Sequence, residues 1–184
     1  MASDLPFGPA DWRSVIGTPR LLLVPLTRAD ASDLFPVLND ASLHRFIGGE
    51  PLTEAALTER YARLEAGTPA NLSEVWANWV VRLRGPGTAI GFVQATISAE
   101  GADLAWVIGQ AWQRRGFASE AVAAMAGWLV DAGVGKLVAH IHPENRASAH
   151  VARRAGLAPT EDVDADGEVV WRGPVVRAPA VGGA

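Results

Sequence analysis

The stretch QRRGFASEA, residues 113–121, puts two arginines and a glycine directly before a run that predicts a helix. The first four N–H groups of a helix have no partner within it, and the helix dipole adds partial positive charge there. Gly116 lets a ligand approach the main chain with no Cβ in the way, and Arg114 and Arg115 add charge beside it. The stretch therefore predicts a site for an anion such as a pyrophosphate. A surface loop with solvated arginines is the alternative that local chemistry leaves open.

Other common patterns for binding phosphate or metal do not occur in this sequence. It contains neither the G-x-G-x-x-G dinucleotide fingerprint nor the G-x-x-x-x-G-K-[ST] loop. Four scattered histidines, no cysteine and no H-E-x-x-H pattern argue against a metal site. The lack of cysteine also excludes disulfides and thiolate nucleophiles. We therefore expect no metal cofactor.

Length and composition fit one globular domain. A chain of 184 residues is ample for a packed core, and a hydrophobic content of 49% argues against disorder of the whole chain. The formal net charge of −4 argues against nucleic acid as the main partner. No apolar run approaches the roughly 18 residues that cross a bilayer, and residues 1–14 do not resemble a signal peptide. We expect a cytosolic protein that binds neither nucleic acid nor membrane.

The pattern of apolar residues and chain breakers predicts a mixed α/β layout around one sheet. Strands are expected at residues 20–26, 74–84, 88–98, 104–109, 136–142 and 168–173. Helices are expected at residues 27–38, 54–66, 117–131 and 146–155, with Thr27 and Thr53 as caps of the first two. Short links predict an antiparallel meander of the second, third and fourth strands. Residues 1–17 are expected to form an arm and residues 175–184 a disordered tail.

Three blocks of the sequence, in order, resemble the GNAT superfamily of acyl-CoA-dependent N-acyltransferases. QRRGFA, residues 113–118, is similar to the [QR]-x-x-G-x-[GA] motif, and HPENRASAHVARRAGL, residues 142–157, resembles the N-x-x-S … G-F segment. TPRLLLVPLTRADASDLF, residues 18–35, resembles the N-terminal block of the branch that includes the acetyltransferases of ribosomal-protein N-termini. The resemblance implies one domain over residues 18–174. Its mixed, mostly antiparallel sheet would have six to seven strands, splay in the middle and carry about four helices.

The resemblance also implies where acetyl-CoA binds as co-substrate. In that family the main-chain N–H groups of the motif loop bind the pyrophosphate. The strand before the loop pairs with the pantetheine arm, at positions that match Val107 and Ile108. Asn145 matches the asparagine near the pantetheine, and it can also cap a helix. The matching loop residues are Gln113, Arg114, Arg115, Gly116, Phe117, Ala118 and Ser119.

Transfer of an acetyl group to an amine needs a base and a stabilised oxyanion, but no covalent enzyme intermediate. His140 lies five residues before Asn145, where some relatives carry a glutamate, and is the predicted base. Its alternative is a polar residue on a half-covered strand. Ser148 is the second predicted catalytic residue, with a small residue in a helix interface as its alternative. Asp103 and Glu74 are weaker candidates for the base.

The sequence departs from the family at the general acid. Many relatives carry a tyrosine seven residues after the asparagine, and that position is Ala152 here. The only tyrosine is Tyr61, in the second expected helix, so the acid is unassigned or water serves. Trp112 and Trp171 are candidates to line an acceptor groove, because the chain holds seven tryptophans and not all are needed in a core.

Together these patterns predict an acetyl-CoA-dependent N-acetyltransferase that works by direct attack in a ternary complex. The expected acceptor is a primary amine, either a protein N-terminus or a small molecule. The protein is expected to be a monomer or a homodimer. A non-catalytic acyl-CoA-binding or regulatory module is the alternative, because the acid is missing and the base rests on one histidine.

Overall fold

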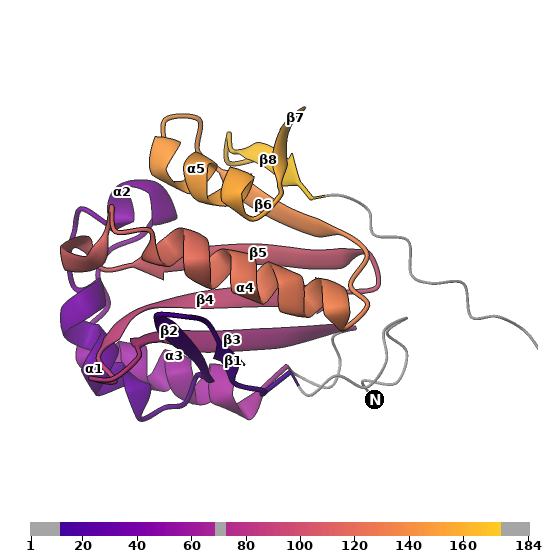
Figure 1. Ribbon diagram of the computed structural model, residues 1–184. Helices are drawn as coiled ribbons and strands as arrows, with labels where there is room; N and C mark the ends of the chain where they lie inside the picture. The colour runs from indigo at the N-terminus through magenta and orange to yellow at the C-terminus, as the bar shows by residue number, and fades with distance from the viewer. Residues whose placement is uncertain (1–11, 69–72, 174–184) are drawn as a thin grey trace, which may run out of the picture.

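One mixed sheet runs through the computed structural model, which describes residues 12–68 and 73–173 (Figure 1). The strand order is β1-β2-β3-β4-β5-β6-β8-β7. The strands are β1 Ile16–Gly17, β2 Leu21–Pro25, β3 Glu74–Leu83, β4 Ala89–Ser98, β5 Gly101–Ile108, β6 Leu137–Ile141, β7 Ala158–Val163 and β8 Val169–Arg172. The helices are α1 Asp30–Leu38, α2 His44–Ile47, α3 Glu54–Ala66, the 3₁₀ turn η1 Gln110–Trp112, α4 Phe117–Asp131 and α5 Arg146–Arg154.

The predicted class, a mixed and mostly antiparallel sheet with flanking helices, is confirmed. In the described residues the sheet has eight strands where six to seven were expected, and five α-helices where about four were expected. The additional elements are β1, α2 and β7. β1 has two residues and α2 has four, too few for a periodic pattern, and β7 is exposed at nearly every position, so it lacks the alternation that marks a strand. The expected tail and residues 1–11 of the expected arm lie outside the described residues.

Of the two predicted helix caps, Thr53 is confirmed and Thr27 is not. Thr53 accepts a hydrogen bond from the N–H of Ala56 at 3.2 Å, so its role as the cap of α3 is confirmed. The prediction for Thr27 is wrong, because α1 begins only at Asp30. There the Asp30 carboxylate accepts from both the N–H and the hydroxyl of Thr27, at 2.7 and 2.8 Å. The carboxylate within the first turn thus replaces the expected side-chain cap.

The sheet opens between β5 and β6. Every other pair of neighbouring strands is antiparallel, whereas these two are parallel because α4 crosses over between them. They pair at only two positions, Ala102 with Leu137 and Asp103 with Val138. Past Asp103, β5 stays paired with β4 as far as Ile108, while β6 stays paired with β8. The predicted splay is therefore confirmed.

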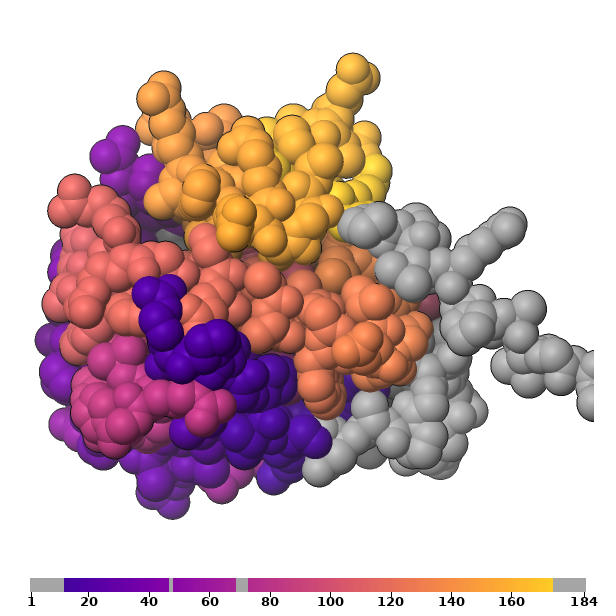
Figure 2. Space-filling model, viewed as in Figure 1, coloured from indigo at the N-terminus to yellow at the C-terminus, as the bar shows by residue number. Residues whose placement is uncertain are grey.

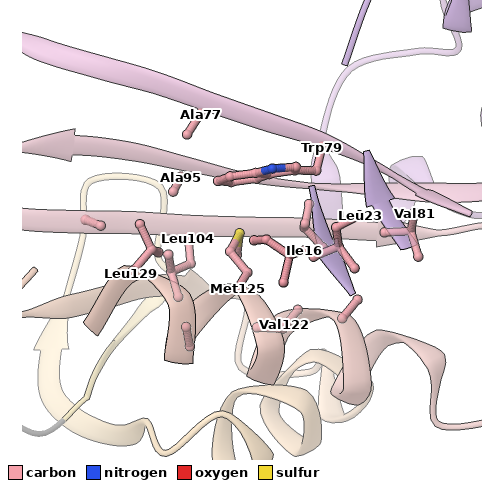
Figure 3. Packing of buried hydrophobic residues seen from close by; sticks show 14 of the residues in the cluster. Ile16, Leu23, Ala77, Trp79, Val81, Ala95, Leu104, Val122, Met125 and Leu129 are labelled. Carbon is pink, nitrogen blue, oxygen red and sulfur yellow. The ribbon is translucent and has the colours of Figure 1, made fainter. Parts of the chain in front are cut away.

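Helices cover both faces of the sheet. Alternate residues of β3 face opposite sides, so Trp79 packs toward Val122 and Met125 of α4, while Val80 packs toward α1 and α3 (Figures 1 and 3). Figure 2 shows the indigo N-terminal residues lying directly against orange α4. A third cluster lies under α5 and contains Trp171, which is 4% exposed. The idea that Trp171 lines an acceptor groove is therefore wrong.

We predict opposite effects on stability for the same substitution at two glycines. Gly91 on β4 lies opposite Ile108, and an added Cβ would lie 2.1 Å from the Val107 carbonyl oxygen. Gly91→Ala should lower the free energy of unfolding by about 3 kcal/mol, because only a shift of strand backbones relieves this overlap. Gly127→Ala, at an exposed and open position of α4, should raise it by about 0.5–1 kcal/mol. Urea unfolding followed by circular dichroism measures both, and a Gly91 variant as stable as the Gly127 variant would contradict the prediction.

Candidate active site

A cavity of about 610 Å³ lies beside the opening between β5 and β6. Its wall comes from the end of β5, the loop and first turn that begin α4, the first turns of α5, and α2 with the residues before it. The predicted cofactor residues that line it are Val107, Ile108, Gln113, Arg114, Gly116, Phe117, Ala118, Ser119 and Asn145. Ser148 lines it as well, whereas Arg115 and His140 are not among the lining residues. Two of the three sequence blocks that carry the resemblance, residues 113–118 and 142–157, thus meet at one cavity.

The loop before α4 has a backbone that suits an anion. Arg114 has φ 58° and Gly116 has φ 79°, and Arg114 is the only residue other than glycine with positive φ in the described part of the chain. Left-handed residues beside right-handed ones turn successive N–H groups toward one point. No side chain caps α4, so its first-turn N–H groups, those of Phe117, Ala118 and Ser119, have no partner within the helix. These N–H groups and the helix dipole make the loop a ready anion site.

Arg20, directly before β2, holds this loop from the outside. Its Nε donates to Glu120 Oε2 at 2.6 Å, its Nη1 donates to the Arg115 carbonyl oxygen at 3.1 Å, and its guanidinium lies 4.7 Å from the Phe117 ring centroid. Glu120 also accepts from the Thr18 hydroxyl at 2.6 Å. Partial burial would raise the pKa of Glu120, but the bonds from Thr18 and Arg20 and the charge of Arg20 hold that pKa below its usual value. The ionised carboxylate therefore stays paired near neutral pH.

The main-chain N–H and C=O groups of successive β5 residues point alternately toward β4 and toward β6. The N–H of Ala102 donates to the carbonyl of Lys136, on the β6 side. Residues two apart in a strand share a side, so the main-chain groups of Trp106 and Ile108 also face the opening. Those of Val107 face β4. Val107 lines the cavity, but its main-chain groups are turned away from the opening, whereas those of Trp106, which also lines the cavity and which the sequence did not single out, face it.

Two side chains fix the ends of the cavity. Gln113 Nε2 donates to the Ile108 carbonyl oxygen at 2.9 Å, which ties the loop to the end of β5. Asn145 Oδ1 accepts from the N–H of Ser148 at 3.0 Å, so the predicted helix cap is confirmed. Ser148 is thereby held in the first turn of α5 at the cavity wall.

α2 and the turn before it form part of the cavity wall, and the sequence analysis missed both. Arg45 pairs with Glu144 at 3.3 Å, which links α2 to the loop before α5. The rings of Phe46 and His142 lie 5.5 Å apart. Arg45 and Phe46 line the cavity, as does Trp112, which keeps its place as a candidate for the acceptor groove. α2 is a single turn, so no signal in the sequence could have identified it.

His140 lies on the other face of the sheet. Ala139 and Ile141, its neighbours on β6, are buried beneath α5, and alternation turns His140 away from them. Its Nδ1 lies 2.6 Å from Asp164 Oδ2, and its Nε2 lies 3.8 Å from Asp103 Oδ1. The side chain is 39% exposed. The predicted base and the cavity thus flank the opening from opposite faces.

Glu74 and Tyr61, two of the other candidates, do not line the cavity. The Glu74 carboxylate accepts from Trp76 Nε1 at 2.6 Å. Tyr61 is 3% exposed in the core below α1 and α3, where burial raises the pKa of its hydroxyl, so it does not reach the cavity.

Within the described ranges, no group of three or more His, Asp or Glu side chains could hold a metal ion. None of the helices in those ranges is long and apolar enough to span a bilayer.

Comparison with known proteins agrees with this geometry. The family model described as an acetyltransferase (GNAT) domain matches residues 20–158. An acetyltransferase (GNAT family) from Bacillus anthracis has a TM-score of 0.72 at 18% identity, covering 86% of this chain and 97% of its own. A putative ribosomal-protein-serine acetyltransferase from Vibrio cholerae has a TM-score of 0.65 at 22% identity, covering 86% and 96%. No curated protein sequence matches this chain.

A further similar structure was solved with acetyl-CoA bound. AAC(6')-Ib in complex with paromomycin and acetyl-CoA has a TM-score of 0.70 at 20% identity, covering 89% of this chain and 99% of its own. At these identities the structures support the fold, while the family model spans most of the chain. The chain is therefore an acetyltransferase of the GNAT family.

Proposed function

We propose that this protein transfers the acetyl group of acetyl-CoA to a primary amine by direct attack in a ternary complex. The observation that carries the proposal is the cavity itself, which joins the start of α4 to the opening between β5 and β6. One end offers unpaired N–H groups with positive charge, and the other offers the free side of a strand. A diphosphate joined to an extended amide chain has matching chemistry.

We assign the binding of CoA accordingly. The pyrophosphate would accept from the N–H groups of residues 114–119, and the pantetheine amides would pair with the open side of β5 at Trp106. The chain would run from α4 toward Asp103 and Val138, where β5 and β6 first separate. The thioester would then lie near that junction. Ordering both substrates there supplies much of the rate gain without a covalent intermediate.

The two predicted catalytic residues flank this junction. His140 is two residues past Val138, the last paired residue of β6, and faces away from α5. We assign it as the base that takes a proton from the attacking amine. Ser148 lies on the cavity wall, and we assign its hydroxyl to hydrogen-bond the leaving thiolate. The proposed attack therefore passes through the opening, with base and leaving group on opposite faces of the sheet.

The acceptor class follows from charge and from the neighbours' ligands. Beside His140, Asp103 is 63% exposed and suits a cationic group. The structure of AAC(6')-Ib holds paromomycin, a polyamine, next to acetyl-CoA, and the Vibrio cholerae protein is named for ribosomal-protein serine. We infer a primary amine on a small cationic molecule or at a protein N-terminus. Thiol release from acetyl-CoA across a panel of both kinds tests this, and CoA binding without turnover on any amine would indicate a binding module instead.

We predict that Ser119→Asp separates CoA binding from stability. A carboxylate in the first turn of α4 repels the pyrophosphate but interacts favourably with the helix dipole. The Kd for CoA, measured by calorimetry, should rise at least about tenfold, while the thermal midpoint should not fall. Ala123→Asp adds the same charge one turn later, outside the cavity wall, and should bind CoA nearly as the parent does. Equal Kd values for the two variants would contradict the assignment of the loop.

We predict that His140→Gln lowers kcat by about 100-fold, the usual effect of losing a general base. The Kd for CoA should stay unchanged, because His140 does not line the cavity. His44→Gln is the matched control, since His44 bonds the Gly48 carbonyl within α2 at 3.1 Å and is outside the cavity wall. If the His140 variant acetylates the best acceptor at the parent rate, His140 is not the base.

A further inference from the structure

We infer that Asp164, on the turn between β7 and β8, is a positioning residue that keeps the His140 proton on Nδ1 and leaves Nε2 to accept a proton from the amine. The inference rests on the proposed function and deepens it. His140 Nδ1 and Asp164 Oδ2 are 2.6 Å apart. An ionised carboxylate only accepts hydrogen bonds, so the nitrogen beside it must carry the proton. In the neutral imidazole the other nitrogen, Nε2, then holds the free lone pair.

The turn is built to hold the Asp164 carboxylate in this position. Its Oδ1 accepts from the N–H of Asp166 at 3.0 Å and from the N–H of Glu168 at 2.9 Å, and its Oδ2 is left for His140. The N–H of Glu168 is the main cause that lowers the pKa of Asp164; desolvation opposes it, and the bonds to His140 and Asp166 assist. Because both oxygens are held, the carboxylate stays ionised and oriented.

The other ring nitrogen faces the junction where acetyl transfer is proposed. Nε2 lies 3.8 Å from Asp103 Oδ1, too far for a direct hydrogen bond, so this contact does not occupy the lone pair. Asp103 pairs with Val138, the last residue before β5 and β6 separate. An ammonium group drawn to Asp103 would therefore arrive beside Nε2. Asp103 would thus attract the charged acceptor, and His140 Nε2 would accept its proton.

A purely structural role makes different predictions. Four charged or titratable groups face His140 or lie close to it: Asp103 from β5, Asp164 from the turn, Glu168 before β8, and His142 after β6. If His140 served only as a cation between carboxylates, removing Asp164 would change the free energy of unfolding. The tautomer of His140 would then have no effect on turnover. If Asp164 positions a base, replacing Asp164 changes both the tautomer of His140 and the rate of turnover.

The tautomer can be read directly by long-range ¹H–¹⁵N spectra of the full chain at a pH where the ring is neutral. The His140 signals are identified by their loss in His140→Gln. We expect Nδ1–H in the parent and Nε2–H in Asp164→Asn, whose amide can keep Oδ1 toward the turn and donate its N–H to the ring. Asp166→Asn is the matched control, since it removes the same charge from the same turn, where Asp166 contributes its main-chain N–H. It should keep Nδ1–H.

Turnover gives the second readout. Asp164→Asn should lower kcat by about 100-fold with an unchanged Kd for CoA, while Asp166→Asn should stay near the parent.

Two results would overturn the inference. One is an Nε2–H tautomer in the parent, and the other is an Asp164→Asn variant as active as Asp166→Asn. Failure of the parent to acetylate any amine would instead count against the proposed function. The tautomer measurement would still decide whether Asp164 orients His140.

Discussion

The structure depends on a single parallel junction in an otherwise antiparallel sheet. Antiparallel neighbours can follow one another through tight turns, but a parallel neighbour needs a crossover, and α4 supplies it. β5 and β6 stay together for two residue pairs and then separate. Separation leaves one side of β5 without a strand, a costly state for buried main-chain groups unless something else pairs with them. An extended ligand with amide groups would meet that need, which is why we propose that the opening holds the pantetheine arm.

The same crossover delivers the second half of the site. Because α4 starts just after β5 ends, its unpaired N–H groups lie at the wide end of the opening. The loop between them has one left-handed residue that is not glycine, Arg114, and such a conformation needs support from its surroundings. Arg20 gives this support through Glu120 and the Arg115 carbonyl. The turn before β2 thus supports a loop that lies about a hundred residues away along the chain.

How much the sequence predicted depends on the range of each interaction. The bounds of α3 and α4 were predicted to the residue, because they rest on local caps, breakers and periodicity. The loop at residues 113–119 was found for the same reason. The contacts of Arg20 with Glu120 and of His140 with Asp164 span 100 and 24 residues and carry no local pattern. Only the pairing of strands in space brings these residues together.

Division of the site between two faces also bears on the missing tyrosine. Ala152 of α5, at the position where many relatives carry one, is fully buried in a cluster with Leu157 and Trp171. A phenol there would overfill a closed cluster, so this chain fills that position for packing. In our proposal the thiolate is stabilised instead from the first turn of α5, where Ser148 lines the cavity. A thiol has a pKa of about 8.5, so a thiolate is a good leaving group, whereas an alkylammonium with a pKa of about 10.4 is mostly protonated near neutral pH and must lose a proton before it attacks. In the mechanism we propose, the demand for catalysis therefore falls mainly on His140 as the base, on the opposite face of the sheet.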